Sequence, residues 1–333
     1  MRIPPRSLAA LAVAILVTGC GGSDGGGSAG SGIAPPIATP SPTPTATPTA
    51  SNSWAGLAAA LYDVPPNVSA CTSGTLKASV KQDFLNRLNG IRALHNLPAV
   101  TYSDDEDGQE ADSSLMMVLA KQLSHEPDTN WRCYSASGAS GAGSSNLVGG
   151  WGTSLPFHSE DDYLGLWLTE GGSADIGHRR WILSPFLGKT SYGRVAVVLP
   201  DGTRASAASM RVFKFKSDPP VPGGVPPFVA YPYGDYPQRY FGLSNYLSFT
   251  AIADPTSSWA NQSVSFASAT ITVTGPSGPM TVTDIAIDNQ GYGVPNSLQW
   301  RVTGLQAGVS YTVRINGVSG APQSSYSYSF RVI

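Results

Sequence analysis

The segment that most constrains the fold of this chain is the proline-rich stretch at residues 217–230, SDPPVPGGVPPFVA, because the hydrophobic pattern differs on its two sides. Before it, apolar residues recur at the spacing of amphipathic helices. After it, short β-branched and aromatic runs are separated by Gly, Pro, Ser and Asn. Proline neither continues a helix nor occupies a central strand. The sequence therefore predicts two folded regions joined by a hinge at residues 217–232.

The first folded region, residues 54–216, is expected to be an α+β layered domain. Helical spacing of apolar residues predicts one helix in VKQDFLNRLNGIRALHNLP, a second from about Asp105 to Leu123, whose first turns are acidic, and a short third helix around Tyr163–Trp167. Strands are expected at residues 193–199 and, from the alternation in MRVFKFK, at 210–216. The Gly- and Ser-rich segment 135–152 is interpreted as a loop.

The second folded region, residues 233–333, is expected to be an all-β antiparallel sandwich. Its runs ATITVTG, TVTDIAI, LQWRVTGL, YTVRING and YSYSFRVI have the length and spacing of strands. The segment Leu305–Val313 resembles the tyrosine corner of fibronectin type III and immunoglobulin-like domains. This region contains no His or Cys, so it offers no catalytic constellation.

The N-terminus has the pattern of an exported lipoprotein. Two arginines precede an apolar run of about ten residues, roughly half of what a membrane span needs, so residues 1–19 are interpreted as a signal peptide. The ending Val-Thr-Gly-Cys resembles a lipobox, which makes Cys20 the expected site of acylation and the lipid bilayer an expected partner. Residues 20–53, rich in Gly and Ser and then in Pro and Thr, are expected to be a flexible linker at the cell envelope.

The charge and the remaining cysteines narrow the functional classes. The net charge is −2 and no basic run follows the extreme N-terminus, which argues against nucleic acid as a partner. Cys71 and Cys133 are expected to form a disulfide, because an exported protein folds in an oxidising compartment. Such a bond would contribute on the order of 4 kcal/mol by the loop-entropy model. Two metal thiolates are the alternative, without the CxxC spacing of zinc sites.

All four histidines lie before residue 179, in the first folded region. His95 at the end of the first helix is interpreted as a surface cation that offsets the helix dipole, and His158 as a solvated loop residue. His125 follows the second helix. His178 is the second residue of the stretch GHRRWIL. This stretch predicts a short helix that ends at Ser184 and Pro185.

Several motifs together are similar to the CAP superfamily, which comprises cysteine-rich secretory proteins, antigen 5 and pathogenesis-related one proteins and is also called the SCP domain. The resemblance covers roughly residues 78–200. It rests on Leu85-Asn86-Arg87 in the first helix, Ser124-His125, Asn146-Leu147, Trp167-Leu168-Thr169-Glu170 and, most specifically, GHRRWIL. The family fold implies an α-β-α sandwich, here followed by the immunoglobulin-like sandwich.

The resemblance implies a cleft lined by two His and two Glu. By motif, His125, His178 and Glu170 match three members, and Ser145 stands where the second acid is expected, next to Asn146. His125 and His178 with a carboxylate could hold zinc or another divalent cation. The loss of an acid weakens both metal binding and hydrolysis. The alternative is that the two histidines are hydrogen-bonded residues that fix the surrounding loops.

The expected function is therefore a lipid-anchored, extracytoplasmic binding module. Its cleft would take a small or apolar ligand, a divalent metal or a protein partner. A metal-dependent peptidase or cell-envelope hydrolase is the alternative. A binding module is favoured over an enzyme because one acid is missing and no nucleophile with a base is visible in the sequence.

Overall fold

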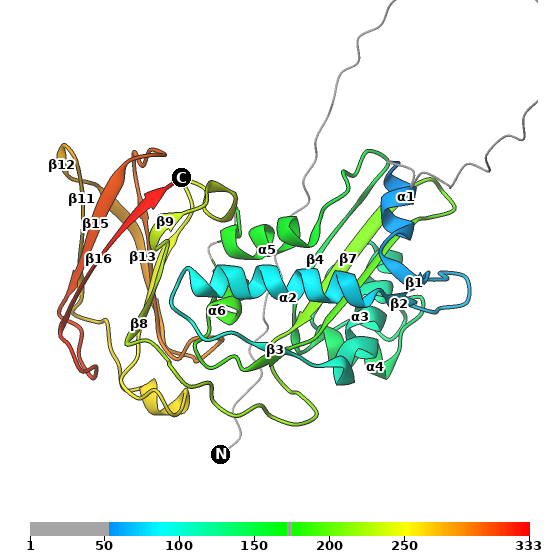
Figure 1. Ribbon diagram of the computed structural model, residues 1–333, viewed down its shortest axis with the longest axis horizontal. Coiled ribbons are helices and arrows are strands. Elements are labelled where there is room, and N and C mark those ends of the chain that lie inside the picture. Colours follow the sequence, from blue (N-terminus) through cyan, green and yellow to red (C-terminus); the bar gives the residue numbers. More distant parts are fainter. Residues whose placement is uncertain (1–52, 172, 174) are drawn as a thin grey trace, which may run out of the picture.

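The computed structural model describes residues 53–171, 173 and 175–333 of the chain (Figure 1). The expected signal peptide, Cys20 and nearly all of the expected linker lie outside these residues. Two folded regions lie side by side, one mixed α/β and one all-β. Within the described residues, no helix has both the length and the apolar character that a membrane crossing requires.

The first region is built on a three-stranded antiparallel sheet in the order β4 (Ser145–Gly152), β7 (Arg204–Arg211), β6 (Tyr192–Val198). One face of the sheet carries α2 (Ala78–Ala93), α5 (Glu160–Thr169) and α1 (Trp54–Ala59). The other face carries α3 (Asp107–Ala120) and α4 (Ala136–Ala142). The expected α-β-α sandwich is confirmed.

Alternation along β6 and β7 explains why helices cover both faces. Successive side chains of a strand point to opposite faces. Tyr192, Ala208 and Met210 pack with Phe84 of α2, whose ring stacks on Tyr192 at 4.0 Å between centroids. The intervening residues pack with α3; they are Val195, Ala205 and Ala207.

Smaller elements complete this region: β1 (Tyr62–Val64), β2 (Thr75–Leu76), β3 (Thr101–Tyr102), η1 (Asp104–Glu106), α6 (Gly177–Ile182) and β5 (Lys189–Thr190). Cys71 lies in the connection between β1 and β2. The predicted disulfide between Cys71 and Cys133 is confirmed, with a Cα–Cα distance of 5.2 Å across a sequence separation of 62.

The Gly- and Ser-rich segment 135–152 is not the loop that composition predicts, because it forms α4 and β4. Its glycines allow close packing. A Cβ on Gly141 would lie 2.2 Å from the carbonyl oxygen of Gln109 in α3, and one on Gly138 would lie 2.9 Å from the backbone of Asp112. The small residues therefore let α4 lie against α3.

The strand predicted at residues 210–216 is also wrong in its bounds, because β7 spans Arg204–Arg211 and the chain then turns. Lys214 has a φ of 53°. The Arg211 side chain folds back and donates hydrogen bonds to the carbonyls of Phe213 and Lys214. These bonds hold the turn that ends the strand.

The second region is a sandwich of two sheets, consistent with an immunoglobulin-like fold. One sheet has the order β13 (Val282–Asp288), β14 (Ser297–Val302), β10 (Leu247–Ala251), β8 (Phe228–Tyr231). The other has the order β12 (Gly278–Pro279), β11 (Thr270–Gly275), β15 (Ser310–Asn316), β16 (Ser325–Val332), β9 (Gly234–Tyr236).

Two details of the sandwich bear on the expectations. The Tyr311 hydroxyl accepts a hydrogen bond from the backbone N–H of Gln306 at 2.8 Å, as a tyrosine corner requires. The expectation of a purely antiparallel sandwich is wrong, because β9 pairs with β16 in parallel. A strand that follows directly on β8 can reach the other sheet in this orientation without a long connection.

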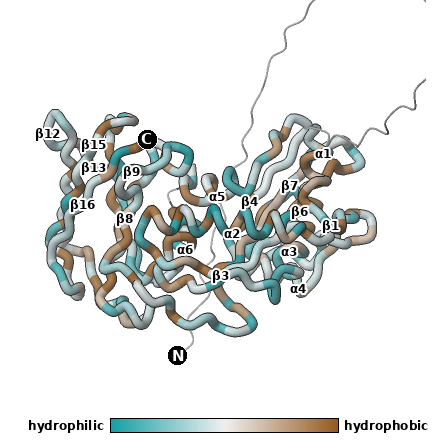
Figure 2. The backbone as a smooth tube through the Cα atoms, in the orientation of Figure 1, coloured by the Kyte–Doolittle hydropathy of each residue, from teal (hydrophilic) through white to brown (hydrophobic). Residues whose placement is uncertain are grey.

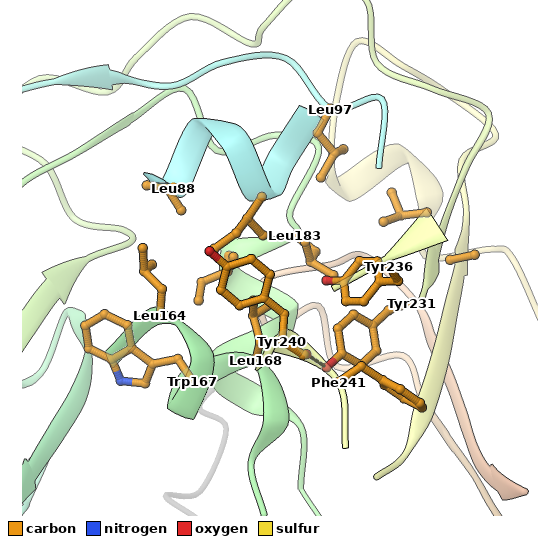
Figure 3. Packing of buried hydrophobic residues seen from close by; sticks show 14 of the residues in the cluster. Leu88, Leu97, Leu164, Trp167, Leu168, Leu183, Tyr231, Tyr236, Tyr240 and Phe241 are labelled. Atoms are coloured by element: carbon orange, nitrogen blue, oxygen red, sulfur yellow. Dashed lines mark hydrogen bonds between the residues drawn. The ribbon is translucent and has the colours of Figure 1, made fainter. Parts of the chain in front are cut away.

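The expected hinge at residues 217–232 is only partly a connection, since its last residues form β8 and pair with β10. The two regions also share one hydrophobic core. Figure 3 shows tyrosines of the second region against leucines around α5 and α6; buried members are Leu164, Leu168, Leu183, Tyr231, Tyr236, Tyr240 and Phe241. Figure 2 colours residues of β8 as hydrophobic, and this strand lies beside the chain around α6.

His95 belongs to this shared core, so its interpretation as a surface cation is wrong. It is 3% exposed, and its Nδ1 and Nε2 lie 2.8 Å from the Ala230 carbonyl and 3.0 Å from the Tyr236 hydroxyl. Burial lowers the pKa of His95 to about 4. A neutral imidazole therefore connects the end of α2 to the second region.

Candidate functional site

The structure brings His178 and Glu170 together at the junction of α5 and α6. Ser159 begins α5 with a capping box that involves Asp162, and the helix ends at Glu170, whose φ is 44°. The next helix, α6, begins at Gly177, and Glu170 Oε1 lies 2.9 Å from His178 Nδ1. The imidazole side chain is 36% exposed and the carboxylate 6% exposed.

The Glu170 carboxylate also caps α6. It accepts hydrogen bonds from the backbone N–H of His178 at 2.9 Å and of Arg179 at 3.4 Å. The residue at the N-cap position, Ile176, has an apolar side chain that cannot accept these bonds. The first N–H groups of a helix lack partners within the helix, and a carboxylate there is favoured. Glu170 thereby stabilises the N-terminus of α6 and orients the imidazole ring of His178.

Asn146 supports the same helix from the sheet. Its side-chain Nδ2 donates to the carbonyl of His178 at 2.9 Å, and the residue is buried at the start of β4. The next residue, Leu147, accepts from the indole N–H of Trp167 at 2.9 Å. The Asn-Leu and Trp-x-x-Glu motifs therefore meet at one place and hold α5 and α6 against β4.

His125 lies in the connection between α3 and α4. Its Nδ1 lies 2.8 Å from the carbonyl oxygen of Ala142, so Nδ1 carries the proton and donates it. Desolvation of the ring lowers the pKa of His125, and a charge on His178 would lower it further. The lowered pKa keeps His125 neutral at neutral pH, with Nε2 as its remaining acceptor.

Both histidines therefore have the same arrangement. Nδ1 is engaged by Glu170 in one and by Ala142 in the other, and among the described residues no hydrogen bond to either Nε2 is found. An imidazole fixed through Nδ1 presents Nε2 as a hydrogen-bond acceptor, a base or a ligand. Each histidine therefore offers one oriented nitrogen, Nε2, and His178 offers it beside Glu170 and Asn146.

Ser145 does not join this group. As neighbours on a strand, Ser145 and Asn146 point to opposite faces, and the Ser145 hydroxyl donates to Glu110 of α3 at 2.5 Å. Glu110 is fully buried and pairs with Arg211 at 3.2 Å, while burial raises its pKa to about 8. This polar cluster lies inside the α3 face. No sequence signal pointed to it, because Glu110 resembles the other acids that begin the helix.

The described residues do not assemble the full set of donors that the resemblance implies for a metal site. In the described part of the chain, no group of three or more His, Cys, Asp and Glu side chains is arranged to hold a metal ion. The Glu170 carboxylate is occupied by His178 and the N-terminus of α6, and Ser145 with Glu110 faces elsewhere. Metal coordination by His125 and His178 stays a prediction from the sequence.

The arginines that follow His178 have a role that sequence reasoning missed. Arg179, 1% exposed, donates to the carbonyls of Leu168 at 2.7 Å and Tyr246 at 2.8 Å, and its guanidinium lies 4.0 Å from the centre of the Tyr231 ring. Arg180 pairs with Asp288 at 2.6 Å. The helix that presents His178 is therefore fixed to the second region by its next two residues.

A comparison with family models identifies the first region. Residues 85–195 match the model described as CAP, the cysteine-rich secretory protein family. The match extends from within α2 to within β6 and includes His125, Asn146, Glu170 and His178. A comparison with curated proteins finds no match.

Proposed function

Since residues 85–195 of this chain form a CAP domain, we propose that the protein is a binding module of the cell envelope whose ligand contacts His178 and His125. The observation that carries the proposal is the His178–Glu170 pair, with a hydrogen bond of 2.9 Å behind a half-exposed imidazole. Because Glu170 already holds the His178 ring in one rotamer, Nε2 can accept a hydrogen bond from a ligand with little further loss of side-chain entropy. The ligand class is a small molecule or a peptide with a hydrogen-bond donor.

The same geometry favours binding over hydrolysis. A hydrolase would need a base together with a metal or a nucleophile, and Glu170 is already engaged by an imidazole and two backbone N–H groups. The described residues gather no three metal donors. Hydrolysis by the His178–Glu170 pair is the alternative, and it requires that activity be lost in His178→Ala.

Imidazole NMR tests the binding proposal directly. The full chain is screened with a library of small hydrogen-bond donors while the ring signals of the four histidines are followed. We expect hits that shift His178 and His125 together and that disappear in His178→Ala. His158→Ala is the matched control, since it removes a half-buried histidine outside the site. Ligands that bind without shifting the ring signals of His178 or His125 would contradict the proposal.

Attachment to a membrane is a separate part of the proposal and rests on the sequence of residues 1–20. An acylated Cys20 would hold the two folded regions at a membrane surface. Labelling of growing cells with a fatty-acid analogue tests this. The label is expected on the wild type and absent from Cys20→Ser, and label on both would exclude acylation at Cys20.

A further inference from the structure

We propose that the second folded region carries a binding surface for a neutral carbohydrate polymer, formed by Trp259 and Tyr292. Trp259 is 73% exposed and Tyr292 is 43% exposed, which is unusual for large side chains of a well-packed sandwich. Exposed apolar groups that lie together commonly mark an interaction site. This surface is separate from His178 and does not depend on the function proposed above.

Trp259 and the Tyr292 loop lie next to each other although they come from different parts of the chain. Trp259 begins the short helix η3 (Trp259–Asn261), and Tyr292 follows β13. A Cβ on Gly291 would lie 3.9 Å from Cζ3 of Trp259 and 3.7 Å from the side-chain nitrogen of Gln262. The indole and an amide donor therefore adjoin the loop that holds the phenol ring.

The loop that presents Trp259 is held rigidly by a fully buried asparagine. Oδ1 of Asn261 accepts from the backbone N–H groups of Ala253 and Asp254 at 2.6 and 2.9 Å. Its Nδ2 donates to the carbonyls of Asp254 and Ser257 at 2.8 and 2.7 Å. A buried polar residue with all these bonds fixes a unique backbone conformation. The exposed indole is thus presented by a preorganised loop.

The Tyr292 loop is fixed by its contact with the first region. Gly293 has a φ of 69°, and a Cβ there would lie 2.4 Å from the backbone of Arg180. The loop is therefore clamped against α6, next to the salt bridge between Arg180 and Asp288. The surface is continuous with the contact between the two folded regions.

The charge of the surface indicates the class of partner. Residues 255–283 and 289–300 contain no Asp, Glu, Lys or Arg. Two acids adjoin these loops: Asp254, whose Oδ1 accepts from Thr256, and Asp288, which is paired with Arg180. Nucleic acids, anionic lipids and acidic polysaccharides need exposed cationic side chains, whereas the cation beside this loop, Arg180, is 5% exposed and paired with an acid. A neutral sugar ring fits, because its C–H face stacks on an aromatic face while its hydroxyls bond to amides such as Gln262.

The test is binding of the full chain to an array of neutral and acidic oligosaccharides, followed by titration of the best neutral probe. We expect binding to neutral chains and a tryptophan fluorescence maximum that shifts to shorter wavelength on binding. Trp259→Ala and Tyr292→Ala are each expected to weaken binding about tenfold. Trp259→Phe should retain part of the affinity.

Ile285→Ala is the matched control, because Ile285 is 55% exposed in the same sandwich and has no ring. Unfolding curves of all variants show whether folding is unchanged, as exposure of these side chains predicts. The absence of binding to every neutral probe overturns the proposal. Equal loss in Ile285→Ala, or unchanged binding in the Trp259 and Tyr292 variants, would likewise overturn it, because the sugar would then bind without using the two rings.

Discussion

The Glu170 carboxylate lies where the end of one helix, the start of another and an imidazole all meet. It accepts from His178 Nδ1 and from two backbone N–H groups of α6, and its side chain is 6% exposed. A buried acceptor with three donors holds its neighbours in one arrangement. The orientation of His178 is therefore a consequence of Glu170.

Replacement of Glu170 by alanine tests this dependence. The variant loses the cap of α6 and leaves buried donors without a partner, so the free energy of unfolding should fall by about 1–3 kcal/mol. The His178 ring should lose its fixed Nδ1–H tautomer, which long-range nitrogen NMR detects. Glu126→Ala, an exposed acid beside His125, serves as the control and should change neither. An unchanged His178 tautomer in Glu170→Ala would contradict the assignment.

His95 makes a pH-dependent contribution to stability. Burial lowers its pKa from 6.5 to about 4, so the proton binds more readily to the unfolded chain than to the folded protein. The contribution is complete above pH 6.5 and is lost as the pH falls toward 4, by up to about 3 kcal/mol. Urea unfolding over a pH series from neutral to mildly acidic buffer measures it.

His95→Gln isolates this contribution, because glutamine keeps a donor for Ala230 and an acceptor for Tyr236 but does not titrate in this range. The wild type should lose more stability than the variant as the pH falls. Parallel curves for the two proteins would show that His95 is not buried in its neutral form.

Glycine has different roles in different elements of this protein. In α4, Gly138 and Gly141 allow backbone contact with α3, whereas a Cβ on Gly90 in α2 would meet no atom within 4 Å. Composition treats these positions alike. The packing of helix on helix determines which of them tolerate a side chain.

Two alanine variants separate these roles. Gly141→Ala brings a Cβ to 2.2 Å from the Gln109 carbonyl and should destabilise the protein by about 1–3 kcal/mol. Gly90→Ala adds a methyl group in open space within a helix and should stabilise it by about 0.5–1 kcal/mol. Chemical denaturation measures both, and equal effects with the same sign would contradict the close packing of α4 on α3.

The two folded regions share one hydrophobic core although the chain has two hydrophobic patterns. Tyr231 and Tyr236 of the second region pack among residues of α2, α5 and α6, and Arg179 crosses the contact. Separate domains usually meet through more polar surfaces. The aromatic contact here couples the two folded regions.

Calorimetry tests the coupling. The wild type should unfold in one transition, because separation of the regions would expose the shared core. Arg179→Met leaves the carbonyls of Leu168 and Tyr246 without donors and should cost about 3 kcal/mol. Arg314→Met, at an exposed position of β15, is the control with little effect. Two resolved transitions in the wild type would show that the regions unfold independently.

Elements with a local signal could be predicted before any contact was known. Periodicity along the chain predicts the helices α2 and α5 and the strands β11, β13, β14, β15 and β16. The expectation of an oxidising compartment predicts the pairing of Cys71 with Cys133. The motifs around Glu170 and His178 carried the family resemblance. Composition misleads at segment 135–152, because glycine favours loops when nothing is known of its neighbours.

Periodicity and motif spacing are properties of the chain, so they were enough to specify the two folded regions, their classes and the histidines worth attention. Which polar residues meet was settled by packing in three dimensions. Ser145 turns toward Glu110, His95 enters a shared core and Arg179 reaches Tyr246. These contacts link residues far apart in sequence, and their energies depend on burial, which no local pattern specifies.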